Sequence, residues 1–168
     1  MSKLSGRHGR AATNYEPSKL MDIVSPEERS RMMAAVRSKN TKPELFLRRG
    51  LHALGYRYRL HRRDLPGTPD LAFPGRHAVV FVNGCFWHGH NCPAAKLPKT
   101  RTEFWRDKIE SNRSRDARNL GRLEHLGWSA LVVWECELRS GDAVMAVARW
   151  LERAGTHKML PDSSLADT

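Results

Sequence analysis

The sequence predicts a single α/β domain in which helices flank a central mixed β-sheet. Short apolar runs typical of strands, the clearest being residues 78–82, stand between capped helical segments on the N-terminal side and longer helical segments on the C-terminal side. A polar loop rich in Cys and His follows that clearest run, and we expect zinc to staple it. With 168 residues, one domain can bury most of the apolar surface that its unfolded chain exposes.

Three regions are expected along the chain. Residues 1–24 lack hydrophobic periodicity and are rich in Ser, Gly, Arg and Lys, which predicts a flexible basic arm that orders on a partner. Residues 25–154 hold the predicted domain, and residues 155–168 are predicted to form a disordered tail. No apolar run approaches the ~20 residues that span a bilayer, and the N-terminus lacks the apolar core of a signal peptide. We therefore expect a cytoplasmic protein without membrane partners.

Positive charge is concentrated in the N-terminal part of the chain. The net charge is +11, and residues 1–63 contain 15 Lys/Arg against 5 Asp/Glu, whereas residues 64–168 contain 14 against 13. A basic block of this kind typically releases counterions from nucleic acid. A solvated basic tail without a partner is the alternative interpretation.

Two short helices are expected before the sheet. Ser25-Pro26-Glu27-Glu28 combines an N-cap, a Pro in the first turn and a Glu three residues after the cap. Thr41-Lys42-Pro43-Glu44 repeats this pattern, and Gly55 is the expected stop. The inward face of the second helix is predicted to carry four leucines: Leu45, Leu47, Leu51 and Leu54.

The strands are predicted by alternation and by turn residues. Tyr56 to Leu60 alternates apolar and basic residues, Asp70 to Phe73 follows a Pro/Gly-rich turn, and Pro74-Gly75 turns the chain into Ala78–Val82 as a hairpin. Because the end of one antiparallel strand lies beside the start of its neighbour, we expect Asp70 to lie close to the Val82–His88 region.

The C-terminal part adds two helices and a strand. Thr102 to Leu126 is predicted to form one long, densely charged helix that Gly127 closes. Trp128 to Trp134 is predicted as a buried strand, and Asp142 to Ala154 as an amphipathic helix stopped by Gly155.

The loop after Val82 contains a metal-ligand pattern that is typical of closed, structural sites. Cys85, His90 and Cys92 are spaced so that a tight loop can wrap one tetrahedral ion, and Cys136, just after a strand, can supply the fourth ligand. A Cys3His site has no open coordination position, which predicts structural zinc. Free loop cysteines with Cys136 as a small core residue are the alternative. Three cysteines cannot all pair, so a disulfide framework is not expected.

Several motifs occur in an order that is specific to one family. They are Leu65-Pro66-Gly67-Thr68-Pro69-Asp70, Gly84-Cys85-Phe86-Trp87-His88, His90 with Cys92, Thr100-Arg101-Thr102-Glu103-Phe104-Trp105, Lys108-Ile109, Arg115-Asp116, Leu126-Gly127-Trp128 and Val133-Trp134-Glu135-Cys136. In these motifs the sequence resembles the very-short-patch repair (Vsr) endonucleases, strand-specific nickases that act at T·G mismatches. The resemblance covers most of residues 25–152. It implies a restriction-endonuclease-like, PD-(D/E)xK nuclease fold in residues 25–154, and zinc ligands at Cys85, His90, Cys92 and Cys136.

The resemblance also implies a catalytic site. Asp70 and the backbone carbonyl of Val82 would bind Mg²⁺, and His88 would be the general base. Asp116 resembles the family's acid partner of an active-site His, and Glu44 its carboxylate near the water shell of the metal. A surface His at position 88 and ordinary helix-surface charges at 44 and 116 are the alternatives.

Val82-Asn83 replaces the Thr-His pair that better-known members carry before Gly-Cys. Val keeps the backbone carbonyl, so metal binding is expected to survive. Asn83 occupies the catalytic position of the second His but cannot be protonated, so we expect the acid role to fall to water at the metal, with an altered rate or metal preference.

Aromatic residues resemble the family's wedge, which enters the duplex beside the mismatch. They are Phe86, Trp87 and Trp105, flanked by four basic residues that would bind DNA: Lys96, Lys99, Arg101 and Arg106. Unstacking costs least where pairing is already defective, so a wedge favours mismatches. The alternative is that these aromatic residues, Trp105 above all, belong to the core.

The leading hypothesis is therefore a Mg²⁺-dependent, zinc-stapled nickase of mismatched double-stranded DNA that acts as a monomer and is associated with the nucleoid. Its target would be T·G mismatches left by deamination of 5-methylcytosine. Two alternatives remain open: a nuclease of the same fold that acts on modified or foreign DNA, and a zinc-stapled module that binds distorted DNA without cutting it. Asp70 and His88 favour cutting over binding.

Overall fold

A computed structural model describes residues 25, 28, 31, 39–139 and 141–156. The predicted basic arm, most of the first predicted helix and residues 157–168 lie outside this part of the chain. At Ser25, the backbone N–H donates to Glu28 Oε2 (3.0 Å) and the Glu28 N–H donates to the Ser25 hydroxyl (3.1 Å). This reciprocal pair is the capping box that the sequence predicts.

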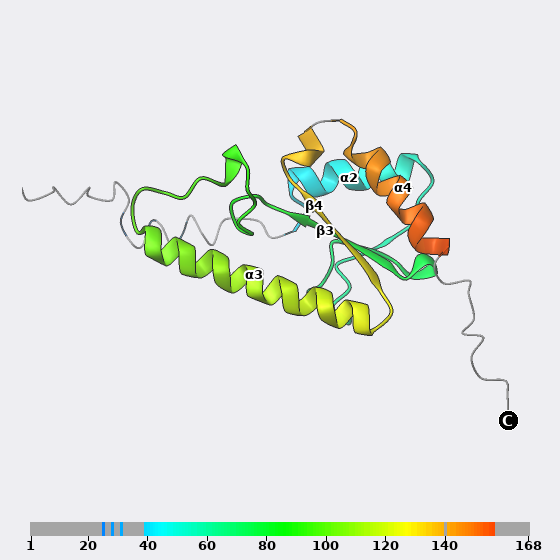
Figure 1. Cartoon of the computed structure of the whole chain (residues 1–168). Coiled ribbons are helices and arrows are strands. Elements are labelled where there is room, and N and C mark those ends of the chain that lie inside the picture. Colours follow the sequence, from blue (N-terminus) through cyan, green and yellow to red (C-terminus); the bar gives the residue numbers. More distant parts are fainter. Residues whose placement is uncertain (1–24, 26–27, 29–30, 32–38, 140, 157–168) are drawn as a thin grey trace, which may run out of the picture.

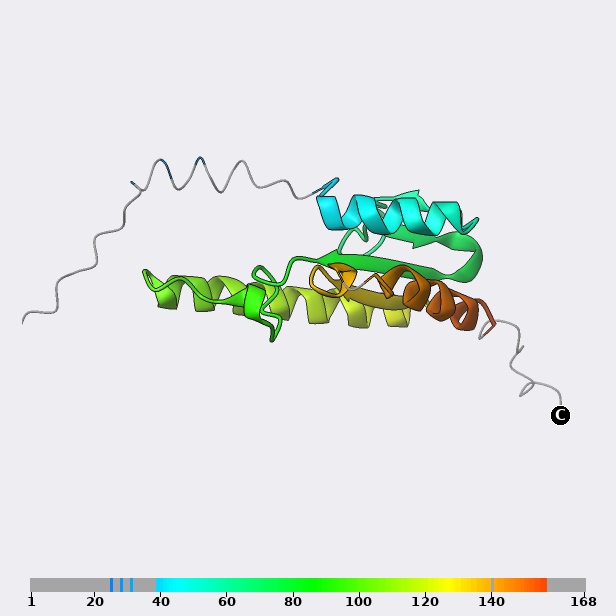
Figure 2. The same cartoon turned by 90° about the horizontal axis from the view of Figure 1, so that it is seen from above.

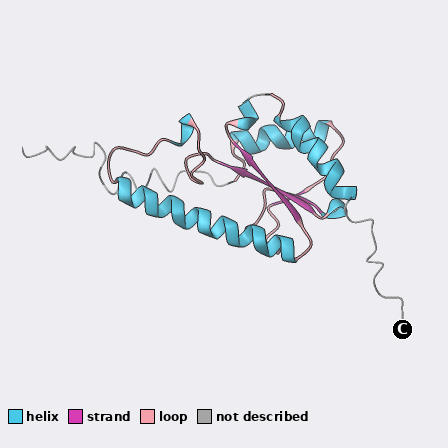
Figure 3. Cartoon of the chain, in the orientation of Figure 1, coloured by secondary structure: helices cyan, strands magenta, loops and turns pink. Residues whose placement is uncertain are grey.

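The core of the molecule is one four-stranded mixed sheet in the order β1-β2-β3-β4 (Figures 1 and 3). The strands are β1 (Arg59–Leu60), β2 (Leu71–Phe73), β3 (Ala78–Asn83) and β4 (Ser129–Trp134). The first three are antiparallel neighbours, while β4 runs parallel to β3. The predicted single α/β domain with a mixed sheet is confirmed.

Among the described residues, three α-helices cover the sheet: α2 (Lys42–Ala53), α3 (Thr102–His125) and α4 (Ala143–Thr156). Helices α2 and α4 pack on one face of the sheet and α3 on the other, with β3 between them (Figure 1), and Figure 2 shows the same elements from above. In the part of the chain that the structure describes, no helix has the length and apolar character needed to cross a membrane.

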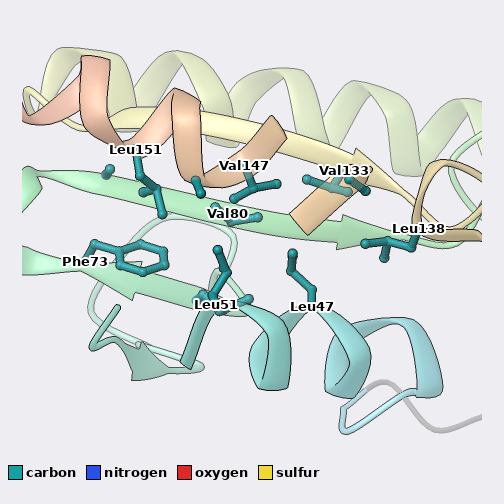
Figure 4. Close-up of a cluster of buried hydrophobic side chains, with 12 residues drawn as sticks. Leu47, Leu51, Phe73, Val80, Val133, Leu138, Val147 and Leu151 are labelled. Atoms are coloured by element: carbon teal, nitrogen blue, oxygen red, sulfur yellow. The ribbon is translucent and has the colours of Figure 1, made fainter. Parts of the chain in front are cut away.

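Successive side chains of β3 enter two different cores, as the pleat of a strand requires. Val80 packs with Leu47, Leu51, Val147 and Leu151 under α2 and α4 (Figure 4). On the opposite face, a second cluster holds Leu65, Ala72, Val79 and Leu123. Burial on both faces explains why residues 78–82 form a continuous apolar run.

The helix ends follow their predicted caps with one exception, Gly155, and one leucine that was predicted to face inward, Leu54, is exposed. Thr41 accepts a hydrogen bond from the Glu44 N–H (3.4 Å), and Gly55 takes the left-handed conformation (φ 89°) after α2, as expected. However, Leu54 is 46% exposed, because α2 ends at Ala53 and turns it away from the sheet. Helix α4 also continues through Gly155 to Thr156, so the predicted stop is wrong.

Two strands also differ from their predictions. Only the last two residues of the predicted Tyr56–Leu60 strand pair with β2, while Tyr56 and Tyr58 pack their rings edge-on against Phe73. Strand β4 is half-buried rather than buried, since it forms an edge of the sheet and only Val133 is nearly inaccessible.

Candidate active site and metal-binding cluster

Asp70 stands at the entry to β2, beside the end of β3. Its carboxylate Oδ2 accepts a hydrogen bond from the Val82 N–H at 2.7 Å, which confirms that the hairpin brings these two positions together. Asp70 is followed by a fully buried strand. Burial raises the pKa of its carboxyl to about 6, and the nearby Glu44 carboxylate acts in the same direction. The Val82 N–H and Arg48 oppose this shift. A cation at this carboxylate would stabilise its charged form.

Glu44 reaches Asp70 from helix α2. The Glu44 side chain is 2% exposed, and its Oε1 pairs with Arg48 Nη1 at 3.0 Å. Between the two carboxylates lies His61, whose Nε2 is 3.2 Å from Glu44 Oε1 and whose Nδ1 is 3.9 Å from Asp70 Oδ1. The proposed carboxylate near the metal thus lies beside Asp70 rather than on an open helix surface.

His88 and Asp116 form a pair between the loop after β3 and helix α3. His88 Nδ1 lies 2.5 Å from Asp116 Oδ2, and both side chains are about one-quarter exposed. A carboxylate at Nδ1 fixes the ring orientation and leaves Nε2 as the nitrogen that can exchange a proton. The structure therefore shows the carboxylate–imidazole contact that the resemblance implies, while the catalytic roles of both residues stay predictions.

One pocket collects these groups at the end of the sheet. Asp70, Val82, Asn83, His88 and Asp116 all line it. Three further lining residues have polar side chains to which the sequence analysis gave no role: Thr68, Arg115 and Asn119. Asn119 lies one turn after Asp116 on the same face of α3, so helical spacing from Asp116 was the signal that could have found it.

The loop between β3 and α3 is held against α3 by specific contacts. The Asn112 side chain, which is 7% exposed, donates a hydrogen bond to the Trp87 carbonyl at 2.9 Å. Gly89 has a φ of 63°, and a Cβ there would lie 2.7 Å from Ile109 Cγ2, so no larger residue fits without a shift. These contacts place His88 over Asp116.

The predicted zinc ligands are assembled in one place. Cys85, His90, Cys92 and Cys136 each offer a donor atom, and these atoms all lie within 4.8 Å of one another. Cys136 Sγ is 3.3 Å from His90 Nδ1, and the His90 ring stacks on Trp134 at a centroid distance of 4.3 Å. The cluster can hold a metal ion, and it joins the loop to the end of β4.

The pKa values of two of these thiols are shifted in opposite directions. Burial, together with the adjacent Cys136 and Cys92 side chains, raises the pKa of the Cys85 thiol to about 12. Burial also acts to raise the pKa of Cys92, but hydrogen bonds from the Ala94 backbone and from Cys85 and Cys136 lower it overall. A tetrahedral cation would allow all three sulfurs to be thiolates, which is the usual state of zinc ligands.

The predicted wedge residues form one aromatic cluster. The Phe86 ring lies 5.1 Å from Trp87 and 5.2 Å from Trp105, centroid to centroid, in edge-to-face contacts. Trp105 is 6% exposed, and its Nε1 finds no hydrogen-bond partner among the described residues. Phe86 and Trp87 are half-buried. Phe104, which the sequence analysis did not select, is 45% exposed beside Trp105.

Basic side chains border this cluster. The four that the sequence analysis selected, Lys96, Lys99, Arg101 and Arg106, are all exposed. The Arg101 guanidinium lies over the Phe104 ring at 4.7 Å. Lys96, Lys99 and Arg101 lie in the segment between the Cys/His cluster and α3, and Arg106 lies in the first turns of that helix.

Comparison with known proteins assigns the class of the protein. A family profile described as DNA mismatch endonuclease Vsr matches residues 21–94. The type II nicking enzyme V.XorIIP of Xanthomonas oryzae pv. oryzae is 54% identical over 130 residues, which cover 77% of this chain and 96% of that protein. The DNA mismatch endonuclease Vsr of Escherichia coli is 42% identical over 120 residues, covering 71% of this chain and 77% of that protein.

A third relative is also named as a nicking enzyme. The type II nicking enzyme V.NmeAIP of Neisseria meningitidis serogroup A is 42% identical over 121 residues, covering 72% of this chain and 86% of that protein. The fold, the pocket and these relatives together define a DNA endonuclease, whose partner is DNA. More specifically, the chain belongs to the Vsr DNA mismatch endonuclease family.

Proposed function

We propose that this protein is a Mg²⁺-dependent nickase that cuts one strand of double-stranded DNA at T·G mismatches left by deamination of 5-methylcytosine. The observation that carries the proposal is the pocket in which Asp70, with its raised pKa, lies near the His88–Asp116 pair. The names of the relatives, which include mismatch endonuclease and nicking enzyme, support the same reaction. We infer that the protein acts as a monomer and is associated with the nucleoid through its substrate.

The residues around Asp70 fit a divalent cation. Two carboxylates from different elements, Glu44 and Asp70, lie on either side of His61, and among the described residues Arg48 forms an ion pair with Glu44. Asp70 and the carbonyl of Val82 would hold Mg²⁺, which prefers oxygen ligands, and Glu44 would accept hydrogen bonds from its water shell. When bound, Mg²⁺ would offset the negative charge that develops on the phosphate during hydrolysis.

His88 and Asp116 supply the proton acceptor of the proposed reaction. The Asp116 carboxylate holds Nδ1, so His88 Nε2 would take the proton from the attacking water. Asn83 lines the same pocket and can donate a hydrogen bond through its amide, but it cannot transfer a proton. In this chain, water rather than a second His would protonate the leaving oxygen.

Zinc is the metal that we propose for the Cys/His cluster. Three sulfurs and one imidazole nitrogen form a closed tetrahedral donor set, which is the composition of structural zinc sites. Such an ion would fix the loop that carries His88, Phe86 and Trp87. Its role would be to hold the base and the aromatic residues in position, not to act on the phosphate.

Mismatch selection is assigned to the aromatic cluster. Phe86 and Trp87 would enter the base stack, where a T·G pair lowers the cost of unstacking. Trp105 lies buried behind them and would contact DNA only if the cluster opened, so its DNA contact stays a prediction. Lys96, Lys99, Arg101 and Arg106 would hold the phosphates on either side.

A nicking assay tests the function. The full chain is incubated with Mg²⁺ and duplexes that are matched, T·G-mismatched or methylated, each in several sequence contexts. Cleavage of one strand at the T·G pair alone supports the proposal. Cleavage of matched, methylated DNA would indicate a nuclease that acts on modified or foreign DNA instead, and tight binding without cleavage would indicate a binding module.

A further inference from the structure

Three side chains from three separate elements converge at the entry to the sheet. Glu44 comes from α2, His61 from the turn after β1, and Asp70 from the residue before β2. One donor atom of each lies within 4.8 Å of the donor atoms of the other two. The sequence analysis selected both carboxylates but gave no role to His61.

The His61 ring is placed as a ligand rather than as a hydrogen-bond donor. Its Nε2 is 3.2 Å from Glu44 Oε1, yet this buried nitrogen makes no hydrogen bond to any described residue. Two adjacent ligands of one octahedral ion, with bonds of about 2.1 Å, lie about 3 Å apart, and no proton stands between them. The separation of Nε2 and Oε1 matches that arrangement.

The backbone holds the ring in this position. His61 has a φ of 46°, in the left-handed region that few residues other than Gly adopt, and its N–H points to the Asp70 carbonyl at 3.4 Å. Such conformations persist where the surrounding structure holds them, and they occur often at ligand sites. The turn after β1 therefore directs an imidazole toward the two carboxylates.

The charges around His61 also favour a cation. Glu44 and Asp70 contribute two carboxylates, while the Arg48 guanidinium forms an ion pair with Glu44 and a hydrogen bond with Asn40. When both carboxylates are ionised, they outnumber the one guanidinium that is paired with them inside this largely buried space. A divalent ion would balance that charge and give the Nε2 lone pair a partner.

We propose that His61 is a ligand of the catalytic cation together with Asp70, that Glu44 then binds the ion directly rather than through its water shell, and that the His61 nitrogen makes the site prefer a transition-metal ion such as Mn²⁺ over Mg²⁺. Oxygen ligands suit Mg²⁺ and Mn²⁺ alike, whereas imidazole adds affinity mainly for transition metals. The inference rests on the proposed function in one respect: the cation bound here is the one used for cleavage.

The test measures how Mn²⁺ is bound, independently of nicking. The full chain, purified with zinc, is titrated with Mn²⁺ by electron paramagnetic resonance, and nitrogen coupling to the bound ion is detected by electron spin-echo modulation. We expect a ¹⁴N coupling from one imidazole. His61→Asn, chosen because Asn tolerates the left-handed region, should abolish the coupling and weaken Mn²⁺ binding about tenfold or more. Mg²⁺ affinity, measured by competition, should fall less.

A matched control is available in the same chain. His77 also has a φ of 46° but lies at the opposite end of β3, so His77→Asn makes the same chemical change away from the cluster. It should leave both the ¹⁴N coupling and the Mn²⁺ affinity unchanged. Melting temperature and zinc content show whether each variant is folded, and His61→Gln replaces His61→Asn if the latter is not.

Two results would overturn the inference: Mn²⁺ bound to the wild-type chain without nitrogen coupling, or a folded His61 variant with unchanged Mn²⁺ affinity. The two proposals remain separable. Nicking at T·G without nitrogen coupling would refute the His61 ligand and support the proposed function. Nitrogen coupling that His61→Asn removes, in a protein that cuts no duplex, would support the metal site and refute the function.

Discussion

The Val82 N–H donates a hydrogen bond to Asp70 Oδ2 at 2.7 Å across the hairpin. This bond orients one carboxylate oxygen toward the strand. A hydrogen bond from a backbone N–H stabilises a carboxylate, but here burial and the Glu44 carboxylate outweigh it, since the pKa of Asp70 is raised to about 6. The site therefore holds its carboxylate at a cost to stability, which leads to the first prediction.

Asp70→Asn should abolish most nicking and yet stabilise the protein without added divalent cations. The pKa of this carboxyl rises from 3.8 to about 6 on folding. Its contribution to the free energy of unfolding is therefore largest below pH 3.8 and is lost as the pH rises through 6. The loss is about 3 kcal/mol at most. At pH 8 the free energy of unfolding of the variant, measured by chemical denaturation, should exceed that of the wild type by about 1–3 kcal/mol, because its amide carries no charge.

The same experiment has an internal check. At pH 5 the difference in unfolding free energy should shrink, and saturating Mg²⁺ or Mn²⁺ should stabilise the wild-type protein while leaving Asp70→Asn nearly unaffected. An Asp70→Asn protein that is less stable at pH 8 than at pH 5, relative to wild type, would contradict the burial argument. Undiminished nicking would remove Asp70 from the active site.

Substitutions of His88 and His90 should have opposite effects on the zinc content of the protein. His90→Ala removes a donor from the Cys/His cluster, so bound zinc measured by mass spectrometry should fall from one ion per chain to nearly none. His88→Ala should keep zinc but lower nicking about 10²–10⁴-fold, since it removes the base. Zinc loss in His88→Ala with retention in His90→Ala would show that the two assignments are reversed.

Asp116→Asn tests whether the carboxylate on α3 acts through His88. The 2.5 Å contact to Nδ1 holds the ring, so the variant should keep its zinc and its DNA affinity but lose about 10–100-fold in single-turnover nicking rate. The pH dependence of that rate should change as well, because the imidazole loses its charged partner. The matched control is Asp107→Asn, an exposed aspartate on the same helix. Equal rates in the two variants would exclude a positioning role.

Much of this site was predictable from local patterns. Pro74-Gly75 predicted the hairpin, and the hairpin alone determines that Asp70 meets Val82, because antiparallel pairing aligns strand ends. The Cys/His loop was equally visible, since three of its donors lie within eight residues. Such contacts depend on turns and register, which short sequence motifs encode.

The role of His61 was not predictable in the same way. Its contact with Glu44 depends on how α2 packs on the sheet, through Leu47 and Leu51, and on a left-handed backbone that no Gly marks. The exposure of Leu54 and the half-burial of β4 were missed for a similar reason. Both follow from where an element lies in the tertiary structure, which periodicity within the element does not reveal.

The last prediction concerns Phe86 and Trp87, which lie edge-on to each other and to Trp105. If both enter the stack, replacing both with Ala should remove roughly 1–3 kcal/mol of stacking per aromatic side chain. The loss should fall on mismatched DNA, because phosphate contacts by Lys96, Lys99 and Arg101 remain. The ratio of nicking rates on T·G and matched duplexes should therefore drop more than the affinity for matched DNA at low salt.

Controls separate this effect from damage to the core. Phe46, 47% exposed on α2 across the sheet from α3, can be replaced by Ala to remove an aromatic ring without altering the ratio. Trp105→Ala, in contrast, removes the buried ring of the cluster and should lower the melting temperature. A Phe86/Trp87 double variant that melts normally and keeps the wild-type ratio would refute the wedge. Discrimination would then belong to side chains that reach the base edges, with Asn83 in the pocket as the first to substitute.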